Sequence, residues 1–321
     1  MFWFIYREKK TKMSIKVLNG DCLEVLDQLT EKSVDTCITS PPYYGLRNYE
    51  REGQIGLEET PEEYVEKMVE VFRKVRRVLK DEGTVWLNLG DSYASNHYTG
   101  ARDSDTGWKH GELSQGYQAR AGGAGGVFKV KDLMGIPWMV AFALRADGWY
   151  LRQDIIWHKP NPMPESVTDR CTKAHEYIFL LSKQKKYYYD HEAIKQPVKE
   201  DWGTRDRTDG KYHNEGTGLS PHTGLEDSYE SANKRSVWTV TTKPFKGAHF
   251  AVFPPDLIEP CVLAGCPEDG TVLDPFGGAG TTGLVADRNG RNAILIELND
   301  EYAEMAIDRI YNDAPLFVDI E

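Results

Sequence analysis

Short runs of hydrophobic residues alternate along the chain with stretches in which apolar side chains recur every three or four positions. The short runs, each bounded by turn-forming residues, predict buried β-strands. Residues 61–80 give the clearest helical pattern, because Thr60 is a good N-cap, Pro61 suits the first turn and the apolar positions form one stripe. The strands expected in the first two thirds are 15–21, 34–39, 84–89, 150–157 and 176–181, and further helices are expected at 22–29 and 132–147.

The last quarter of the chain shows the same alternation of strands and helices. This order predicts a mainly parallel sheet covered by helices on both faces, so the expected fold class is α/β. Two polar stretches, 95–126 and 184–247, lack periodicity, and the first is expected to be a mobile loop. The elements expected near the C-terminus are strands at 271–273 and 292–297 and helices at 254–263, 284–288 and 301–310.

Composition narrows the class of protein. The 321 residues are 40% hydrophobic and 28% charged, as in a folded globular protein, and no apolar run approaches the ~20 residues that cross a membrane. The five cysteines are odd in number, scattered and without a C-x-x-C pair, so we expect reduced thiols in a cytoplasmic protein and no metal site. Residues 1–12 are expected to be a loose N-terminal tail, and both Met1 and Met13 are left open as the natural start.

A glycine-rich turn at 274–282 lies between a buried strand and a helix. Glycines let a ligand approach the backbone, and the free N–H groups of the next helix bind polar groups. Glu297 ends the following strand about 20 residues later, where a carboxylate binds ribose hydroxyls. The third glycine of the dinucleotide spacing is missing, so a nucleoside-containing cofactor other than NAD is favoured. Asp274 and Phe276 suit a cofactor with an ammonium and a sulfonium, because a carboxylate and an aromatic face both attract cations.

Ser40, Pro41, Pro42 and Tyr43 directly follow the strand predicted at 34–39. Two prolines fix the backbone and remove two N–H donors, so the carbonyl groups of Ser40 and Pro41 become rigid acceptors. Tyr43 adds a flat ring on which a base can stack. The combination suits the exocyclic amine of a planar base, although a proline turn that only ends a strand has the same sequence.

With both motifs in one chain, the sequence resembles the amino-group DNA methyltransferases, which methylate cytosine N4 or adenine N6 with S-adenosyl-L-methionine. It is similar to their permuted, beta-type branch, in which the catalytic motif precedes the cofactor motif. The resemblance covers residues 15–310 and implies a circularly permuted class I methyltransferase fold with about seven mostly parallel strands. Five segments carry it in order: Asn19-Gly-Asp21, Thr39-Ser-Pro-Pro-Tyr43, His249–Pro254, Asp274–Thr282 and Glu297.

The resemblance also implies site residues and a mechanism. A base flipped out of duplex DNA would stack on Tyr43, and the Ser40 side chain and the Pro41 carbonyl would accept hydrogen bonds from its amine. No covalent intermediate and no metal would be needed. Catalytic positions are thus Ser40, Pro41, Pro42 and Tyr43, and cofactor-binding positions are Asp21, Thr39, Asp274, Phe276, Gly277, Gly278, Gly280, Thr281, Thr282 and Glu297.

Several alternatives stay open at this point. Ser at position 40 favours cytosine N4 within the family, whereas Asp or Asn is commoner for adenine N6. RNA and a protein side-chain amide are alternative substrates, since related folds methylate protein glutamine, and a relative without activity would only bind DNA. Pro260-Cys261 is similar to the nucleophile motif of cytosine-C5 methyltransferases, but it lies in a helical run and is interpreted as structural. A cognate restriction endonuclease, and a monomer or homodimer, are also left open.

The net charge of −11 argues at first against a DNA partner. The charge is uneven, however: residues 248–321 hold 3 basic and 14 acidic side chains, whereas 183–247 hold 12 basic and 10 acidic ones. DNA contacts are therefore expected away from 248–321, and candidates are Lys159, Asn161, Lys185, Lys186, Arg205, Arg207, Lys234 and Arg235. The predicted division is a tail (1–12), a catalytic part (13–183), a target-recognition region (184–247) and an S-adenosylmethionine-binding part of the same domain (248–321).

Overall fold

The computed structural model describes residues 13–46, 48, 51, 53–94, 128–197, 231–242, 253–313 and 318–320. The predicted tail at 1–12 and the predicted mobile loop at 95–126 lie outside these residues, as do Arg205, Arg207 and residues 249–252. Among the described helices, none combines the length and the hydropathy that a membrane crossing requires.

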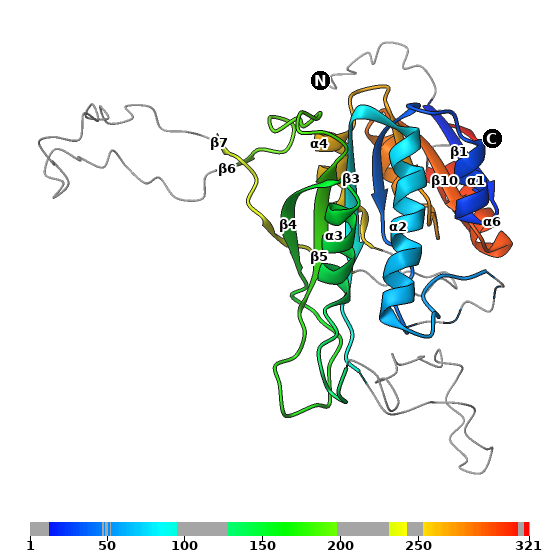
Figure 1. The fold of residues 1–321 in the computed structure, drawn as a ribbon. Helices are drawn as coiled ribbons and strands as arrows, with labels where there is room; N and C mark the ends of the chain where they lie inside the picture. The colour runs from blue at the N-terminus through cyan, green and yellow to red at the C-terminus, as the bar shows by residue number, and fades with distance from the viewer. Residues whose placement is uncertain are drawn as a thin grey trace, which may run out of the picture.

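A nine-stranded sheet forms the centre of the described part of the chain (Figure 1). Its strands are parallel except that β5 runs antiparallel to both of its neighbours, β3 and β4. The predicted mostly parallel α/β fold is thus confirmed. The expected seven strands become nine because a three-residue strand adds to each edge. In sheet order the strands are β11 (Val318–Ile320), β1 (Met13–Asn19), β10 (Asn292–Glu297), β9 (Thr271–Asp274), β2 (Val34–Thr39), β3 (Leu79–Leu89), β5 (His175–Ser182), β4 (Tyr150–His158) and β8 (Val237–Thr239).

Helices cover both faces of this sheet, and each face has its own hydrophobic cluster. The first cluster contains the buried sides of α1 (Cys22–Gln28), α2 (Pro61–Val78) and α3 (Ile136–Ala146). The second contains residues of α4 (Pro255–Gly265), α5 (Thr281–Arg288) and α6 (Asp300–Asp313). Because helices cover both faces of the sheet, the central strands are continuous apolar runs in the sequence.

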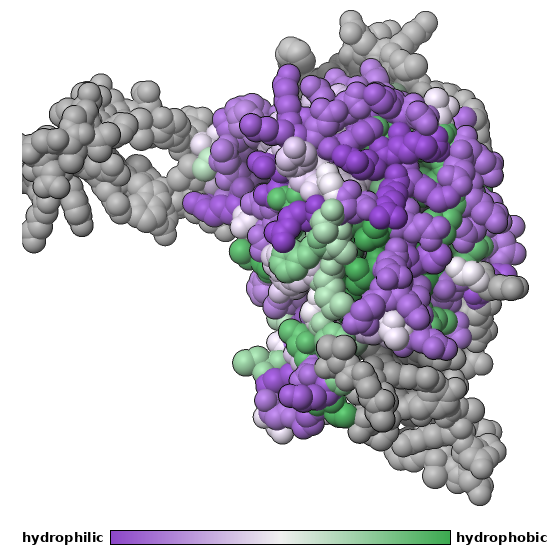
Figure 2. All heavy atoms as spheres, viewed as in Figure 1, coloured by the Kyte–Doolittle hydropathy of each residue, from purple (hydrophilic) through white to green (hydrophobic). Residues whose placement is uncertain are grey.

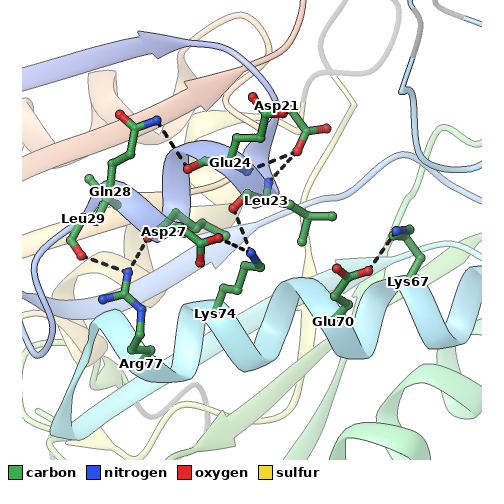
Figure 3. Close-up of polar contacts among 11 residues, drawn as sticks. Asp21, Leu23, Glu24, Asp27, Gln28, Leu29, Lys67, Glu70, Lys74 and Arg77 are labelled. Carbon is green, nitrogen blue, oxygen red and sulfur yellow. Dashed lines mark hydrogen bonds and ion pairs between the residues drawn. The ribbon is translucent and has the colours of Figure 1, made fainter.

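Helix α2 begins where the sequence predicts. The Thr60 side chain accepts the Glu63 N–H, the Glu63 carboxylate accepts the Thr60 N–H, and Pro61 occupies the first turn. Figure 3 shows how this helix holds α1: the Lys74 ammonium donates to the Leu23 carbonyl at 3.2 Å, and the Arg77 guanidinium donates to carbonyls at the end of α1. The Arg77 bonds add donors to carbonyl groups at the C-terminal end of α1, and together the bonds hold the short helix against α2.

The outer surface over α2 is mainly hydrophilic, whereas a hydrophobic strip runs over the neighbouring α3 (Figure 2). Phe142 on α3 is 46% exposed and lies beside Trp138, with 5.4 Å between the ring centroids. Exposed apolar side chains are normal on folded proteins, because polar groups do not cover the whole surface.

The region 184–247, expected to recognise the target, is partly built into the sheet. Strand β8 pairs in parallel with β4, and the Trp238 side chain is buried in the second cluster. A small separate pair is formed by β6 (Gln196–Pro197) and β7 (Ser231–Ala232). Residues 198–230 and 243–247 of this region lie outside the described part of the chain.

Candidate active site

A cavity of about 800 Å³ opens at the carboxyl ends of β1, β10, β9 and β2, which are consecutive in the sheet. In open parallel sheets, ligands bind at the carboxyl ends of the strands. Four segments that are far apart in sequence meet in its wall: residues 20–22, 40–43, 274–279 and 297–299. The two motifs singled out in the sequence therefore lie in one site, on the adjacent strands β2 and β9.

The glycine-rich turn is held tightly against β10. The Gly277 N–H donates to the Ile296 carbonyl at 2.8 Å, and the Glu297 carboxylate accepts the Gly278 N–H at 2.7 Å. Gly280 has a φ of +75°, and a Cβ there would lie 2.8 Å from the Ala306 Cβ on α6. Glycine is thus required at 280 by both the backbone and the packing. Burial is the main cause that raises the pKa of Glu297, which lines the cavity.

Asp274 is a buried hub between the two motifs. Its carboxylate accepts the hydroxyl groups of Thr39 and Thr282, each at 2.6 Å, and the Phe276 N–H at 3.1 Å. These bonds connect the end of β2, the glycine turn and the start of α5. The side chain is 1% exposed, and burial raises its pKa to about 6 against the opposing effect of the three donors.

Most of the predicted cofactor residues line the cavity, but three do not. Thr39 and Thr282 are turned to Asp274, and Gly280 packs against α6. The two threonine hydroxyls and the Gly280 backbone therefore support the wall of the cavity but do not line it. The predicted residues in the wall are Asp21, Asp274, Phe276, Gly277, Gly278, Thr281 and Glu297. Two of these also have structural bonds: Asp21 caps α1 through the Leu23 N–H, and the Thr281 hydroxyl accepts from Arg309.

The Ser40–Tyr43 turn, predicted to be catalytic, lies in the same wall with all four residues. The Tyr64 hydroxyl donates to the Pro42 carbonyl at 2.9 Å, so this acceptor is already used. No described group donates a hydrogen bond to the Pro41 carbonyl. The Ser40 hydroxyl is 3.4 Å from the Tyr43 hydroxyl, a long contact that leaves it able to bind another group.

Polar residues that the motifs did not indicate complete this side of the cavity. Glu176 at the start of β5 and Asn88 near the end of β3 both contact the Tyr43 hydroxyl, at 2.8 and 3.2 Å. Glu176 also forms an ion pair with Lys159. The Lys159 ammonium lies 4.1 Å from the Trp157 ring centroid and its side chain is only 18% exposed, so it is a cavity residue and not a freely exposed cation.

The other predicted DNA-binding residues are dispersed. Because β5 is antiparallel to β3, Lys185 and Lys186 lie near the start of β3, where the Lys186 ammonium is 3.7 Å from Glu82. They therefore lie at the opposite end of the strands from the cavity, and their predicted contact with DNA stays a prediction. Asn161 lines the cavity, but its side chain is bonded to the Thr242 backbone.

The last two described DNA-binding candidates, Lys234 and Arg235, lie just before β8, the strand at one lateral edge of the sheet. Lys234 lies 5.0 Å from the Trp238 ring centroid and lines a separate cavity of about 300 Å³, and Arg235 is exposed.

Cys261, considered above as an alternative nucleophile, is fully buried in α4, and burial raises its thiol pKa. Both facts agree with its interpretation as structural, since a nucleophilic cysteine needs access and a thiolate.

The geometry and the sequence agree with one known family. Residues 34–308 match the N6/N4 methyltransferases, described as DNA methylases. The chain belongs to this family. It is 47% identical over 297 residues to the type II methyltransferase M.SmaI of Serratia marcescens, a match that covers 92% of this chain and 91% of that protein. It is 43% identical over 297 residues to M.Cfr9I of Citrobacter freundii, covering 92% and 88%.

Solved structures share the fold of this methylase. A Thermus thermophilus protein, TTHA0409, determined with S-adenosyl-L-methionine, aligns with a TM-score of 0.60 at 24% identity, covering 95% of this chain and 97% of that one. The cytosine-N4-specific PvuII DNA methyltransferase aligns with a TM-score of 0.60 at 19% identity, covering 97% and 98%. The family uses S-adenosyl-L-methionine as cofactor, as the sequence led us to expect.

Proposed function

We propose that this methylase transfers a methyl group from S-adenosyl-L-methionine to the N4 amine of a cytosine that is flipped out of a specific site in duplex DNA. The observation that carries the proposal is the convergence of two turns in one cavity. The Ser40–Tyr43 turn follows β2, the 274–280 turn follows β9, and the two strands are neighbours. An amine acceptor and a nucleoside-binding turn thus face the same space.

The residues of the cavity fit the cofactor. The Glu297 carboxylate would bind the ribose hydroxyls, because each of its oxygens accepts only one backbone N–H, from Gly278 or Asn299. The cationic part would lie near the Phe276 ring and Asp274. When bound, S-adenosyl-L-methionine supplies an electrophilic methyl group on its sulfonium.

The chain's own residues orient the amine. The Tyr43 ring would stack on the flipped base, while the Ser40 hydroxyl and the Pro41 carbonyl accept its two amine hydrogens. The Pro41 carbonyl suits this function, since Tyr64 occupies the Pro42 carbonyl and no described group occupies that of Pro41. Both acceptors hold the amine nitrogen with its lone pair toward the methyl group, and the departing proton passes to solvent in the open cavity.

The choice of cytosine over adenine rests on one residue. Position 40 is a serine. In the adenine-N6 enzymes of the family, Asp or Asn is commoner at this position of the motif. Adenine N6 is the alternative target. The chain order, with residues 39–43 before 274–282, supports the permuted branch of the family.

Three further assignments belong to the same proposal. Residues 184–247 would recognise the target sequence, and duplex DNA would approach the cavity edge that holds Lys159. The names of the relatives, type II methyltransferases, support a cognate restriction endonuclease as partner.

A transfer assay separates the proposed substrate from its rivals. Purified protein is incubated with methyl-labelled S-adenosyl-L-methionine and, in parallel, with duplex DNA, single-stranded RNA or a protein extract. We expect label in duplex DNA alone, because the chain belongs to a family of DNA methylases. The assay measures acid-precipitable label for each substrate.

The Ser40→Ala protein is assayed beside the wild type as a control. Label that is equal for the two proteins would come from a contaminating enzyme. Label that goes to RNA or protein, and not to DNA, would contradict the proposed substrate. Binding of DNA with no transfer to any substrate would favour the interpretation as a binding protein.

A further inference from the structure

Tyr43 is held at its hydroxyl and at its ring edge. Its hydroxyl lies 2.8 Å from the Glu176 Oε2 and 3.2 Å from the Asn88 Oδ1. Its ring packs on Gly90, where an added Cβ would lie 2.6 Å from the Tyr43 Cε2. A stacking ring that is fixed at both places presents one face to the cavity without a loss of entropy when the base arrives.

Glu176 uses both of its oxygens within this group. Oε2 accepts from Tyr43 and from the Asn88 amide at 3.3 Å, and Oε1 pairs with the Lys159 ammonium. The Glu176 side chain is only 16% exposed, so its charge needs a cation nearby. Lys159, the residue that follows β4, supplies this cation, and the Trp157 ring packs against the same ammonium.

The electrostatics define the direction of the Tyr43 hydrogen bond. Burial and the negative charge of Glu176 raise the pKa of Tyr43 well above its usual value. The phenol therefore stays protonated and donates to the carboxylate. A charge-assisted bond of this kind is roughly twice as strong as a bond between neutral groups.

We infer that Glu176 is a positioning residue for methyl transfer: it fixes the Tyr43 ring against the flipped base through the Tyr43 hydroxyl, and Lys159 balances its charge. The inference rests on the proposed function, since it assigns Tyr43 to the base. Glu176 itself would not contact the flipped base. No motif marked Glu176, although a charged residue at the start of an otherwise apolar strand is a visible signal.

The substitution Glu176→Leu keeps much of the volume but removes the acceptor. We expect kcat to fall by roughly 10- to 100-fold, because a misplaced stacking ring loses near-attack geometry. The KM for S-adenosyl-L-methionine should stay within a factor of about two, since Glu176 contacts none of the residues assigned to the cofactor. Glu176→Gln, which still accepts from Tyr43, should recover most of the lost kcat.

A double-mutant cycle tests whether Glu176 acts through the Tyr43 hydroxyl. Tyr43→Phe keeps the ring and removes the hydroxyl, so its kcat should resemble that of Glu176→Leu. Adding Glu176→Leu to Tyr43→Phe should then lower kcat by less than a factor of about three. A duplex with 2-aminopurine at the target position gives a second readout: its fluorescence should be brighter with either variant, because a looser ring quenches the flipped base less.

The control is Glu192→Gln, which removes a glutamate whose exposed ion pair with Lys195 spans 2.8 Å, outside the cavity; it should be fully active. If Glu176→Leu fails to fold, Gly90→Ala displaces the same ring without changing charge and should give the same loss of kcat and the same fluorescence. Equal losses from Glu176→Leu in the wild-type and Tyr43→Phe backgrounds, or a fully active Glu176→Leu, would overturn the inference. A wild-type protein that never methylates DNA would instead overturn the proposed function on which it rests.

Discussion

Replacement of Ser40 by alanine is expected to lower the rate of methyl transfer to DNA by roughly 100-fold while the protein still binds S-adenosyl-L-methionine. The loss follows from the geometry: Ser40 supplies one of two acceptors for the target amine, and loss of one preorganised hydrogen-bonding group typically costs 10²–10³ in kcat. Cofactor binding should persist because the 274–280 turn is held by β10 and Asp274, not by Ser40. Single-turnover rates and calorimetric titration with the cofactor measure the two quantities.

Ser33→Ala is a matched control, since the Ser33 hydroxyl only donates to the Thr30 carbonyl in an exposed turn before β2. It should have wild-type activity and cofactor affinity. Near-normal turnover of Ser40→Ala would remove Ser40 from the mechanism. A parallel loss of cofactor affinity would show that Ser40 maintains the shape of the cavity instead of orienting the amine.

Asp274→Ala is expected to have the largest effect on stability, with a loss of about 3 kcal/mol in the free energy of unfolding at neutral pH. The change leaves the Thr39 and Thr282 hydroxyls and the Phe276 N–H without their acceptor in the core, and each unpaired buried group costs about 1–3 kcal/mol. Release of the buried charge offsets part of this cost. Cofactor affinity should fall as well, because the glycine turn loses its connection to β2. Urea unfolding measures the first effect and titration the second.

Asp274→Asn separates the charge from the hydrogen bonds, since its amide can bond the same three groups. Burial raises the pKa of Asp274 to about 6, above the ordinary value of 3.8. The native protein therefore holds this proton more tightly than the unfolded chain, and stability from this group is present in acid and declines as pH rises from about 4 through about 6. Relative to the wild type, Asp274→Asn should gain up to about 3 kcal/mol between pH 4 and pH 7. A difference that is constant over this range would contradict the assignment.

The parts of the fold that follow from local sequence were predicted well. The strand at 34–39 ends at Thr39 as expected, because the prolines that follow cannot continue the ladder. Other boundaries depended on distant partners. Strand β3 begins at Leu79 and not at Thr84, since Leu79 pairs with Val34 despite the polar residues that follow it. Helix α5 begins at Thr281, where burial against α6 and the bond to Asp274 override the low helix propensity of threonine.

The site was predictable where it consists of contiguous motifs and unpredictable where it depends on strand direction. Ser40–Tyr43 and 274–279 lie together because their strands are parallel neighbours. Lys185 and Lys186 were chosen as DNA-binding candidates from local charge, and the antiparallel direction of β5 places them at the opposite end of the strands from the cavity. The same reversal brings Glu176, at the start of β5, to the cavity. The charge of Glu176 at the start of an apolar strand is visible in the sequence, but its place in the cavity follows only from the order and direction of the strands.

Methylation in a living cell tests the central claim most directly. The gene is expressed in a bacterial host that lacks DNA methyltransferases, beside its Ser40→Ala variant, and the genomic DNA is analysed by long-read sequencing and by mass spectrometry of its nucleosides. The proposed function predicts N4-methylcytosine in a single sequence context, present with the wild type and greatly reduced with the variant. DNA without any modified base would contradict amino-group DNA methylation, and N6-methyladenine alone would contradict the assignment of the target base.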